Sequence, residues 1–285
     1  MRVTYNRQHN KPGENGAVNH KRVLITGAGS GLGRALAFRF AENGWRVACA
    51  DIRLEKAQDT VRLITGFGAG AMALQADVGD DASVEEMRDE ILAAWDGVDV
   101  VVNNAGVASA GSVAQTSLED WRWTLNINLM GVVRGCRAFL PTLLEQKAGH
   151  IINIASFAGI ANAPRMAAYS ASKSGVISLS ECLRGELAVI DSKVRVSVVC
   201  PAFFQTNLMD GARAPDGDKN AAKKLMATSG DSADEVALRI YQGMQRGDFL
   251  ILPTKAEPMR WRIKRFLPET FFKKLVAVVR SGGRS

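Results

Sequence analysis

The sequence has few cysteines, and none is arranged to bind a metal. Four occur among 285 residues, with no CxxC pair and no histidine at ligand spacing. Each is surrounded by apolar residues, which predicts buried, reduced thiols rather than disulfides or metal ligands. The four are Cys49, Cys136, Cys182 and Cys200. A secreted disulfide scaffold and a metal centre are therefore not expected.

Long apolar runs are also missing. No stretch approaches the roughly 20 consecutive apolar residues that span a bilayer. Residues 1–20 are polar and lack the apolar segment of a secretory signal, so we expect a flexible extension there. These absences together predict a cytoplasmic protein.

Net negative charge is absent as well, since the chain carries a formal charge of +7. From Arg260 onward, eight basic residues face one acidic residue, which accounts for the whole excess. Residues 23–259 carry −4, because residues 1–22 are also basic. A general nucleic-acid surface on the body of the protein is thus not expected.

The basic segment has the pattern of amphipathic helices. Within residues 254–285, apolar side chains recur at i, i+4 and i+7. Such a helix either packs on the domain or a partner subunit, or lies on an anionic membrane through residues 256–285. The recurring residues are Met259, Ile263 and Phe266, then Phe272, Val276 and Val279.

Between the two extensions, short apolar runs alternate with amphipathic stretches. Continuously apolar strands that alternate with helices predict a parallel sheet covered on both faces. We expect one doubly wound α/β domain over 21–253, with about seven strands, and a polar substrate lid over 210–230. The predicted strands are 22–26, 46–50, 71–76, 98–102, 150–155, 194–200 and 248–252. The predicted helices are 32–43, 54–64, 82–95, 117–146, 168–190 and 232–246.

A glycine-rich turn follows the first predicted strand. Residues 26–33 read TGAGSGLG and lead into a helix. A helix N-terminus and glycines without side chains form a site for a phosphate group. The spacing is TGxxxGxG rather than GxGxxG, and an ordinary strand-to-helix turn is the alternative. The cofactor residues predicted here are Gly27, Ser30, Gly31, Leu32 and Gly33.

The second and third strands end in carboxylates. Asp51 can accept both hydroxyls of an adenosine ribose and would repel a 2′-phosphate, which predicts NAD. Its alternative role is to cap the next helix, and Arg53 leaves NADP open. Asp77 and Val78 are placed to contact the adenine. The backbone of Asn104–Gly106, which includes Ala105, would run past the cofactor.

These motifs resemble the short-chain dehydrogenase/reductase family. The resemblance covers residues 21–207 and includes NNAG at 103–106 and Tyr169-Ser170-Ala171-Ser172-Lys173. It implies a Rossmann fold, a nicotinamide-dependent oxidoreductase and a homodimer or homotetramer that associates through the helices holding Asn128 and Tyr169. It also marks Asn128, Ser156, Tyr169 and Lys173 as the catalytic residues.

The chemistry of these residue types agrees with such roles. Tyr169 would exchange a proton with the substrate oxygen. The Lys173 ammonium lies one helical turn further on, and together with the positively charged nicotinamide ring it would stabilise the phenolate and so lower the pKa of Tyr169. Ser156 would donate a hydrogen bond to that oxygen. By resemblance, Asn128 holds a water that relays protons to Lys173; Asn126 lacks the N-x-x-G spacing.

The sixth strand is followed by Pro201-Ala202 where the family usually has Pro-Gly. If this position required a positive φ, Ala202 would cost about 1 kcal/mol or shift the loop. Pro201 and the residues after it are still expected to contact the cofactor, Phe204 through its backbone and Thr206 through its hydroxyl.

The expected substrate pocket is apolar, although aromatic residues and methionines more often fill a core. It would bind a hydrophobic secondary alcohol or ketone, such as a steroid, a retinoid or a lipid derivative. Alternatives are a reductase of 3-oxoacyl or small polyol and carbonyl compounds, and a catalytically silent NAD(H)-binding protein that docks through its basic tail. The predicted lining residues are Phe157, Met166, Phe203, Leu208 and Met209.

Overall fold

The computed structural model describes residues 21–68 and 70–282, so the extension predicted over 1–20 lies outside the described residues. The described part contains a seven-stranded sheet in the order β3-β2-β1-β4-β5-β6-β7, and all of its neighbouring strands pair in parallel. The strands are β1 Arg22–Thr26, β2 Arg46–Asp51, β3 Ala71–Gln75, β4 Val100–Asn103, β5 Gly149–Ile154, β6 Val194–Val199 and β7 Leu250–Ile251. The prediction of a doubly wound parallel sheet is confirmed.

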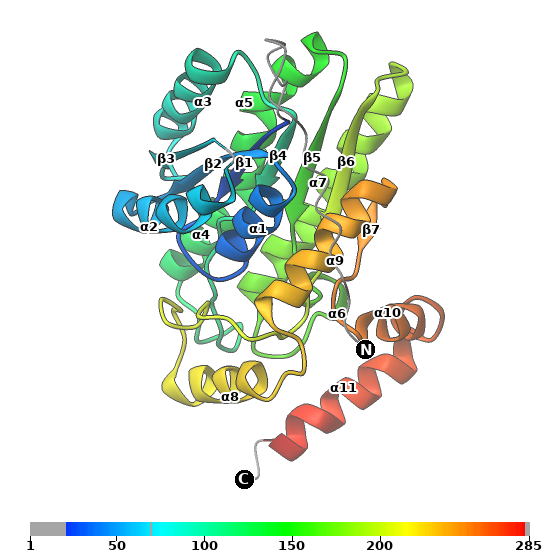
Figure 1. The fold of residues 1–285 in the computed structure, drawn as a ribbon. Helices are drawn as coiled ribbons and strands as arrows, with labels where there is room; N and C mark the ends of the chain where they lie inside the picture. Colours follow the sequence, from blue (N-terminus) through cyan, green and yellow to red (C-terminus); the bar gives the residue numbers. More distant parts are fainter. Residues whose placement is uncertain (1–20, 69, 283–285) are drawn as a thin grey trace, which may run out of the picture.

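Helices cover both faces of this sheet (Figure 1). On one face, α1 (Gly31–Glu42), α2 (Leu54–Ile64) and α9 (Ala233–Arg246) pack on alternate strand residues such as Val23 and Ile25. On the other, α3 (Asp81–Trp95), α5 (Gly131–Glu145) and α7 (Ala167–Val189) pack on residues such as Leu24. Two buried faces explain why apolar residues run continuously along most of each strand instead of alternating with polar ones.

The long helix predicted over 117–146 is interrupted. It consists of α4 (Leu118–Leu125), a π-helical segment (Asn126–Met130) and α5. A π segment inserts one extra residue into the helical repeat, which hydrophobic periodicity does not reveal. The chain also forms a short α6 (Ala158–Ala161), α8 (Asp216–Ala227) inside the predicted lid, and a 3₁₀ turn (Thr65–Phe67), none of which was predicted.

The strand order reverses between β1 and β4. In doubly wound sheets, ligands bind in the crevice beyond the carboxyl ends of the strands at this point. Here the two ends are Thr26 and Asn103. The glycine-rich turn follows the first and NNAG begins at the second, so the fold brings both motifs to one crevice.

The basic C-terminal segment forms two helices, α10 (Glu257–Phe266) and α11 (Pro268–Gly282). They lie at one end of the domain, and α11 extends away from it (Figure 1). Phe271, 9% exposed, packs with Phe157 and Ala161, and Trp261 and Ile263 are half-buried in the same cluster. One side of the segment is therefore packed against the domain.

The prediction for the cysteines is partly wrong. Cys49, Cys136 and Cys200 are buried thiols, and burial raises the pKa of each to about 12. Cys182 is exposed on α7, and the apolar surroundings expected for it are wrong, because the charged residues Glu181 and Arg184 lie beside it in the sequence.

A membrane span needs a helix that is both long and apolar. None of the described helices is long and apolar enough to cross a bilayer.

Candidate active site

The glycine-rich turn forms a tight cradle at the start of α1. Gly27 and Gly31 adopt φ of +65° and +51°, a region that favours glycine. A Cβ on Gly33 would collide with the Gly27 carbonyl, and a Cβ on Gly29 would lie 2.6 Å from an Asp51 carboxylate oxygen. The cradle therefore requires glycine for close backbone packing, beyond the need for a flexible turn.

The N-terminus of α1 is suited to an anion. Its N-cap residue, Ser30, makes no side-chain capping hydrogen bond, and its first turn contains no acidic residue. The backbone N–H groups of a helix start attract a phosphate. The side chain of Leu32 is buried in the core, so the backbone is the part of this residue available to a cofactor.

Asp51 connects the second strand to this cradle. Its Oδ2 accepts a hydrogen bond from the Gly29 amide at 2.9 Å, and its Oδ1 accepts one from the Arg53 amide at 3.1 Å. A carboxylate oxygen has further lone pairs, so both can still accept ribose hydroxyls. The side chain of Arg53 is exposed.

Two residues that support the cradle were missed at the sequence level. Arg34 donates to the Gly29 carbonyl at 2.5 Å and to Thr60 Oγ1 at 3.0 Å, and Thr60 donates to the Ala28 carbonyl at 2.8 Å. Arg34 follows the glycine motif directly, which was the available signal. Thr60 lies on α2 and becomes a neighbour only through the tertiary fold.

The other predicted cofactor residues line the same crevice. Thr26 Oγ1 accepts from the amides of Asn104 and Ala105 at 3.0 and 3.1 Å, which holds the NNAG segment against the cradle. Asp77 accepts from the Gly79 amide at 2.7 Å, and the Val78 carbonyl accepts from Arg134 at 3.1 Å. Both follow β3, whose last residue, Gln75, pairs with Asp51 at the end of β2.

The four predicted catalytic residues come together beside this crevice. Ser156 follows β5, Tyr169 and Lys173 lie one turn apart on α7, and Asn128 lies in the π-helical segment. All four are buried. Gly106 joins them to the cofactor crevice, since a Cβ there would lie 3.0 Å from Asn128 Oδ1 and 3.5 Å from Lys173 Nζ.

Hydrogen bonds fix the orientation of this group. Lys173 Nζ donates to the Ile154 carbonyl at 2.9 Å and lies 5.9 Å from the centroid of the Tyr169 ring. The Ser156 hydroxyl hydrogen-bonds to the Tyr169 side chain and lies 3.4 Å from the Pro201 carbonyl. Asn128 Oδ1 accepts from the Val107 amide at 2.8 Å.

Burial dominates the electrostatics of Tyr169 and Lys173. Burial raises the pKa of Tyr169, and the Ser156 hydrogen bond opposes this rise without cancelling it. Burial also lowers the pKa of Lys173 to about 8, opposed by the neighbouring Cys200. The protein's own side chains thus do not produce the predicted lowering at Tyr169, because desolvation penalises the phenolate more than its neighbours favour it.

The loop after β6 approaches the cradle. A Cβ on Gly31 would lie 3.0 Å from Thr206 Oγ1 and 3.2 Å from Asn207 Oδ1, so both side chains face the helix start. Phe204 is buried in the core. Ala202 is not among the described non-glycine residues with positive φ, so replacement of glycine at this position causes no strain of that kind.

The residues predicted to line a substrate pocket are distributed over two clusters and the loop edges. Phe157 packs against Phe271 of the C-terminal segment. Met209, with Leu208 beside it, packs against Ala108. Phe203 is 38% exposed, and Met166 forms a parallel bridge with Gly111 at the start of α7.

The predicted lid is docked on the domain. Arg165 donates two hydrogen bonds of 2.7 Å to the carboxylate of Asp218 on α8. The backbone of Arg213 pairs with Ala108 and Ala110, each at 3.1 Å. Residues 210–230 therefore cover the edge of the site near the loop after β4.

Comparison with known proteins agrees with this arrangement. The family model described as short chain dehydrogenase matches residues 21–217. The probable oxidoreductase EphD of Mycobacterium tuberculosis is 36% identical over 234 residues, which are 79% of this chain and 39% of EphD, so the chain spans about two fifths of that relative. The D-threitol dehydrogenase of Mycolicibacterium smegmatis is 36% identical over 222 residues, covering 77% of this chain and 84% of the relative.

A solved structure is similar in fold as well. A short chain dehydrogenase/reductase from Burkholderia phymatum, crystallised in complex with NAD, superimposes with a TM-score of 0.83 at 32% identity. The match covers 88% of this chain and 95% of that one.

Proposed function

Because the chain belongs to the short-chain dehydrogenase family, we propose that it transfers a hydride between nicotinamide and a hydrophobic secondary alcohol or ketone. The observation that carries the proposal is the convergence of Asn128, Ser156, Tyr169 and Lys173 beside the glycine cradle. The residues of the crevice fit a dinucleotide: bare amides at the start of α1 for the pyrophosphate and Asp51 for the ribose.

Each catalytic side chain has one task in this proposal. The nicotinamide, when bound, supplies or accepts the hydride. Tyr169, protonated at neutral pH, donates its proton to the carbonyl oxygen in reduction and takes it back in oxidation. Ser156 donates a hydrogen bond to the same oxygen as its charge develops. Lys173 holds a positive charge near the phenol, and Asn128 fixes the loop that begins at Val107.

We propose NAD rather than NADP as the cofactor. Asp51 is buried at the end of β2 with its carboxylate against the cradle, where a 2′-phosphate would meet a negative charge. The exposed Arg53, two residues after Asp51, keeps NADP as the alternative.

The substrate class rests on the apolar residues near the site. Phe157 follows Ser156 directly in the sequence, and Leu208 and Met209 come from the loop after β6. A steroid, a retinoid or a lipid-derived alcohol would bury its surface there. The likeness to a D-threitol dehydrogenase supports the alternative of a small polyol, and a 3-oxoacyl compound or a silent NAD(H)-binding protein are further alternatives.

A substrate screen tests the function directly. NADH formation would be followed with hydroxysteroids, retinol, long-chain secondary alcohols, polyols and 3-hydroxyacyl thioesters. We expect the highest kcat/KM among the hydrophobic alcohols. Turnover confined to polyols or thioesters would reject the substrate class, and NADH binding without turnover of any compound would favour the silent alternative.

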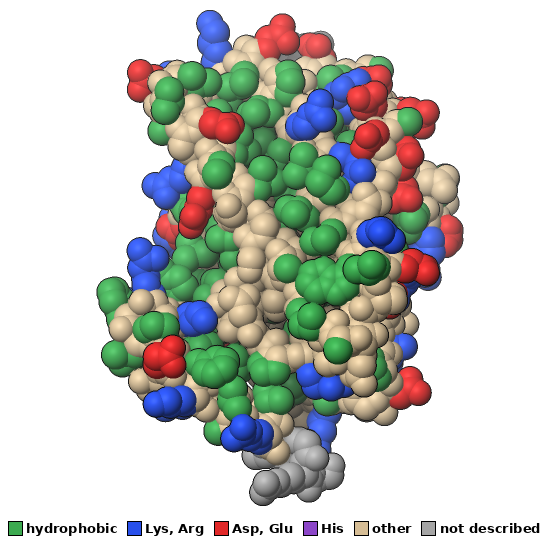
Figure 2. All heavy atoms as spheres, turned by 180° about the vertical axis from the view of Figure 1, so that it is seen from behind, with side chains coloured by type: hydrophobic (Ala, Val, Ile, Leu, Met, Phe, Trp, Pro, Cys, Tyr) green, Lys and Arg blue, Asp and Glu red, His purple; other side chains and the backbone are tan. Residues whose placement is uncertain are grey.

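We propose that the protein forms a homodimer or homotetramer. The face opposite the viewer in Figure 1, which α5 and α7 cover, carries a broad area of hydrophobic side chains (Figure 2). Met130, at the junction of the π segment and α5, is 43% exposed. Sedimentation velocity should give twice or four times the mass of 30.7 kDa. A monomer at all concentrations would contradict this.

We also propose that the protein is cytoplasmic and that α10 and α11 contact an anionic membrane. Phe266 and Phe272 are exposed on these helices at 74% and 53%, although the opposite side of the segment is packed. Lys273 and Arg280 are exposed on α11 as well, next to the exposed residues Phe272 and Val279. Aromatic side chains beside cations are typical of helices that lie on anionic lipid.

Vesicle flotation tests this contact. The protein should float with phosphatidylcholine vesicles that contain phosphatidylglycerol and remain behind with phosphatidylcholine alone. Phe272→Asp should abolish flotation, whereas Leu63→Asp, an equally exposed position on α2, should not. Equal partitioning of the two variants would reject the membrane contact.

A further inference from the structure

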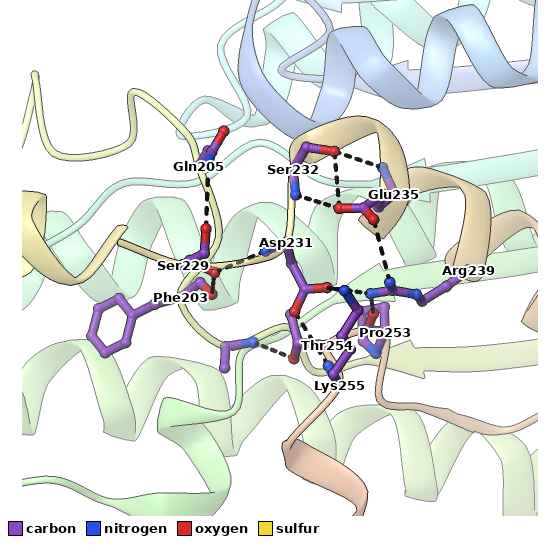
Figure 3. Close-up of polar contacts among 11 residues, drawn as sticks. Phe203, Gln205, Ser229, Asp231, Ser232, Glu235, Arg239, Pro253, Thr254 and Lys255 are labelled. Atoms are coloured by element: carbon purple, nitrogen blue, oxygen red, sulfur yellow. Dashed lines mark hydrogen bonds and ion pairs between the residues drawn. The ribbon is translucent and has the colours of Figure 1, made fainter. Parts of the chain in front are cut away.

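A buried carboxylate outside the catalytic group holds three segments together. Asp231 is 6% exposed and lies just before the N-cap of α9 (Figure 3). Its Oδ1 accepts a hydrogen bond of 2.6 Å from Arg239, and its Oδ2 accepts one of 3.3 Å from the Lys255 amide. Arg239 also donates to the Pro253 carbonyl at 2.8 Å. One ion pair thus joins the start of α9 to the segment between β7 and α10.

The same segments hold the loop that follows β6. The Gln205 amide donates to the backbone carbonyl of Asp231 at 3.1 Å, and Ser229 Oγ donates to the Phe203 carbonyl at 2.8 Å. From the other side, the Ala202 amide donates to Thr254 Oγ1 at 3.2 Å. Residues 202–205 are therefore fixed at both ends by groups that the Asp231 ion pair keeps in place (Figure 3).

This arrangement also closes the base of the lid. The chain leaves the base at Gln205 and returns to it at Ser229, and Gln205 Nε2 donates to the Ser229 carbonyl at 3.3 Å. The intervening residues carry α8 and reach Arg165 at their far end. The position of the base of the predicted lid thus depends on residues 229–231.

Asp231 is suited to hold such a base because it stays ionised. Burial alone would raise the pKa of its carboxyl, but the hydrogen bond from Arg239 and that from the Lys255 amide outweigh burial and lower it. Arg239 is its nearest cation, and Lys255 Nζ lies 3.9 Å from the same Oδ1. Removing one partner of a buried ion pair destabilises a protein much more than breaking an exposed pair does.

We propose that Asp231, with Arg239, is a positioning residue for the cofactor-facing loop: the ion pair holds residues 202–206 so that Thr206 faces the start of α1. The proposal rests on the proposed nicotinamide-dependent function. It assigns Asp231 no contact with substrate or cofactor. Its effect reaches them through Gln205 and through Ser229, which set the path of the loop.

The test compares Asp231→Asn with Asp234→Asn, a matched change at an exposed position in the first turn of α9. NADH affinity would be measured by nucleotide fluorescence, and kcat and KM for NAD with the best substrate of the screen. Asp231→Asn should weaken NADH binding and raise KM for NAD about tenfold, the result of losing one charge-assisted contact in the support. Asp234→Asn should match the unmodified protein.

A second variant keeps the proposal testable if Asp231→Asn does not fold. Thr254→Val removes the acceptor for the Ala202 amide but leaves the ion pair intact, and it should change KM for NAD in the same direction by a smaller factor. Folding would be checked by circular dichroism. If both variants fold and bind NADH as the unmodified protein does, the positioning role is wrong. If the unmodified protein fails to bind NADH, the proposed function fails instead.

Discussion

Replacing Tyr169 with phenylalanine should lower kcat by about 10³-fold while NADH still binds. The change removes one oxygen from a buried ring on α7 and leaves the cradle of α1 untouched. General acid–base catalysis by a positioned side chain contributes about 10² to 10⁴ in rate, and Tyr169 is the side chain that exchanges the proton in the proposed mechanism. Stopped-flow measurement of hydride transfer, with NADH fluorescence for binding, gives both quantities.

Tyr241→Phe is the matched control for this change. Tyr241 lies on α9, accepts a hydrogen bond of 3.2 Å from Trp45 Nε1, and packs edge-on against Phe40. Its loss should reduce stability by about 1 kcal/mol and leave kcat unchanged. Turnover retained by Tyr169→Phe would refute the assigned acid and base, whereas loss of turnover in both variants would indicate a general structural effect.

Replacing Asp51 with alanine should raise KM for NAD by about 10- to 100-fold and narrow the preference for NAD over NADP. The variant loses the charged acceptor for the ribose hydroxyls, and hydrogen bonds to a charged group contribute about 1.5–3 kcal/mol. It also removes the acceptor of the Gly29 amide, which loosens the cradle. The measurement is the ratio of kcat/KM for the two cofactors.

Asp51→Asn separates these two effects. Its side-chain oxygen can still accept from Gly29, so the cradle keeps its shape while the negative charge disappears. We expect better use of NADP with a smaller loss for NAD than in Asp51→Ala. Asp59→Ala, at a half-buried position on α2, should alter neither ratio. If the ratio of kcat/KM for NAD and NADP were unchanged in both Asp51 variants, the ribose-binding role of Asp51 would be wrong, and the carboxylate would serve only to hold the cradle.

Most of the sheet and the positions of the motifs could be predicted from the sequence. Apolar runs that lack alternation belong to strands buried on both faces, and the seven runs agree with the seven strands within two residues at each end. The residues that follow β1 and β4 meet because parallel strands end at one edge of the sheet. Local pattern and topology were sufficient there.

Other features depend on contacts that no local pattern encodes. The direction of the Tyr169 pKa depends on how completely the ring is buried, and the sequence suggested the charge of Lys173 without the desolvation that opposes it. Asp231 precedes an ordinary capping box, in which Ser232 and Glu235 satisfy each other. Its link to Lys255 spans 24 residues and arises from the return of the chain after β7.

Phe271 of α11 packs on Phe157, which is the residue directly after Ser156. The C-terminal helices therefore contact the turn that carries this serine. A ligand that bound more tightly to one position of α11 than to another would then change the free energy of the turn that carries this serine. Linkage is reciprocal, so substrate or product held at Ser156 would alter the affinity of α11 for that ligand by the same factor. Binding at the active site and binding at α11 would then be thermodynamically coupled, so that a change in one would be measurable as a change in the affinity of the other.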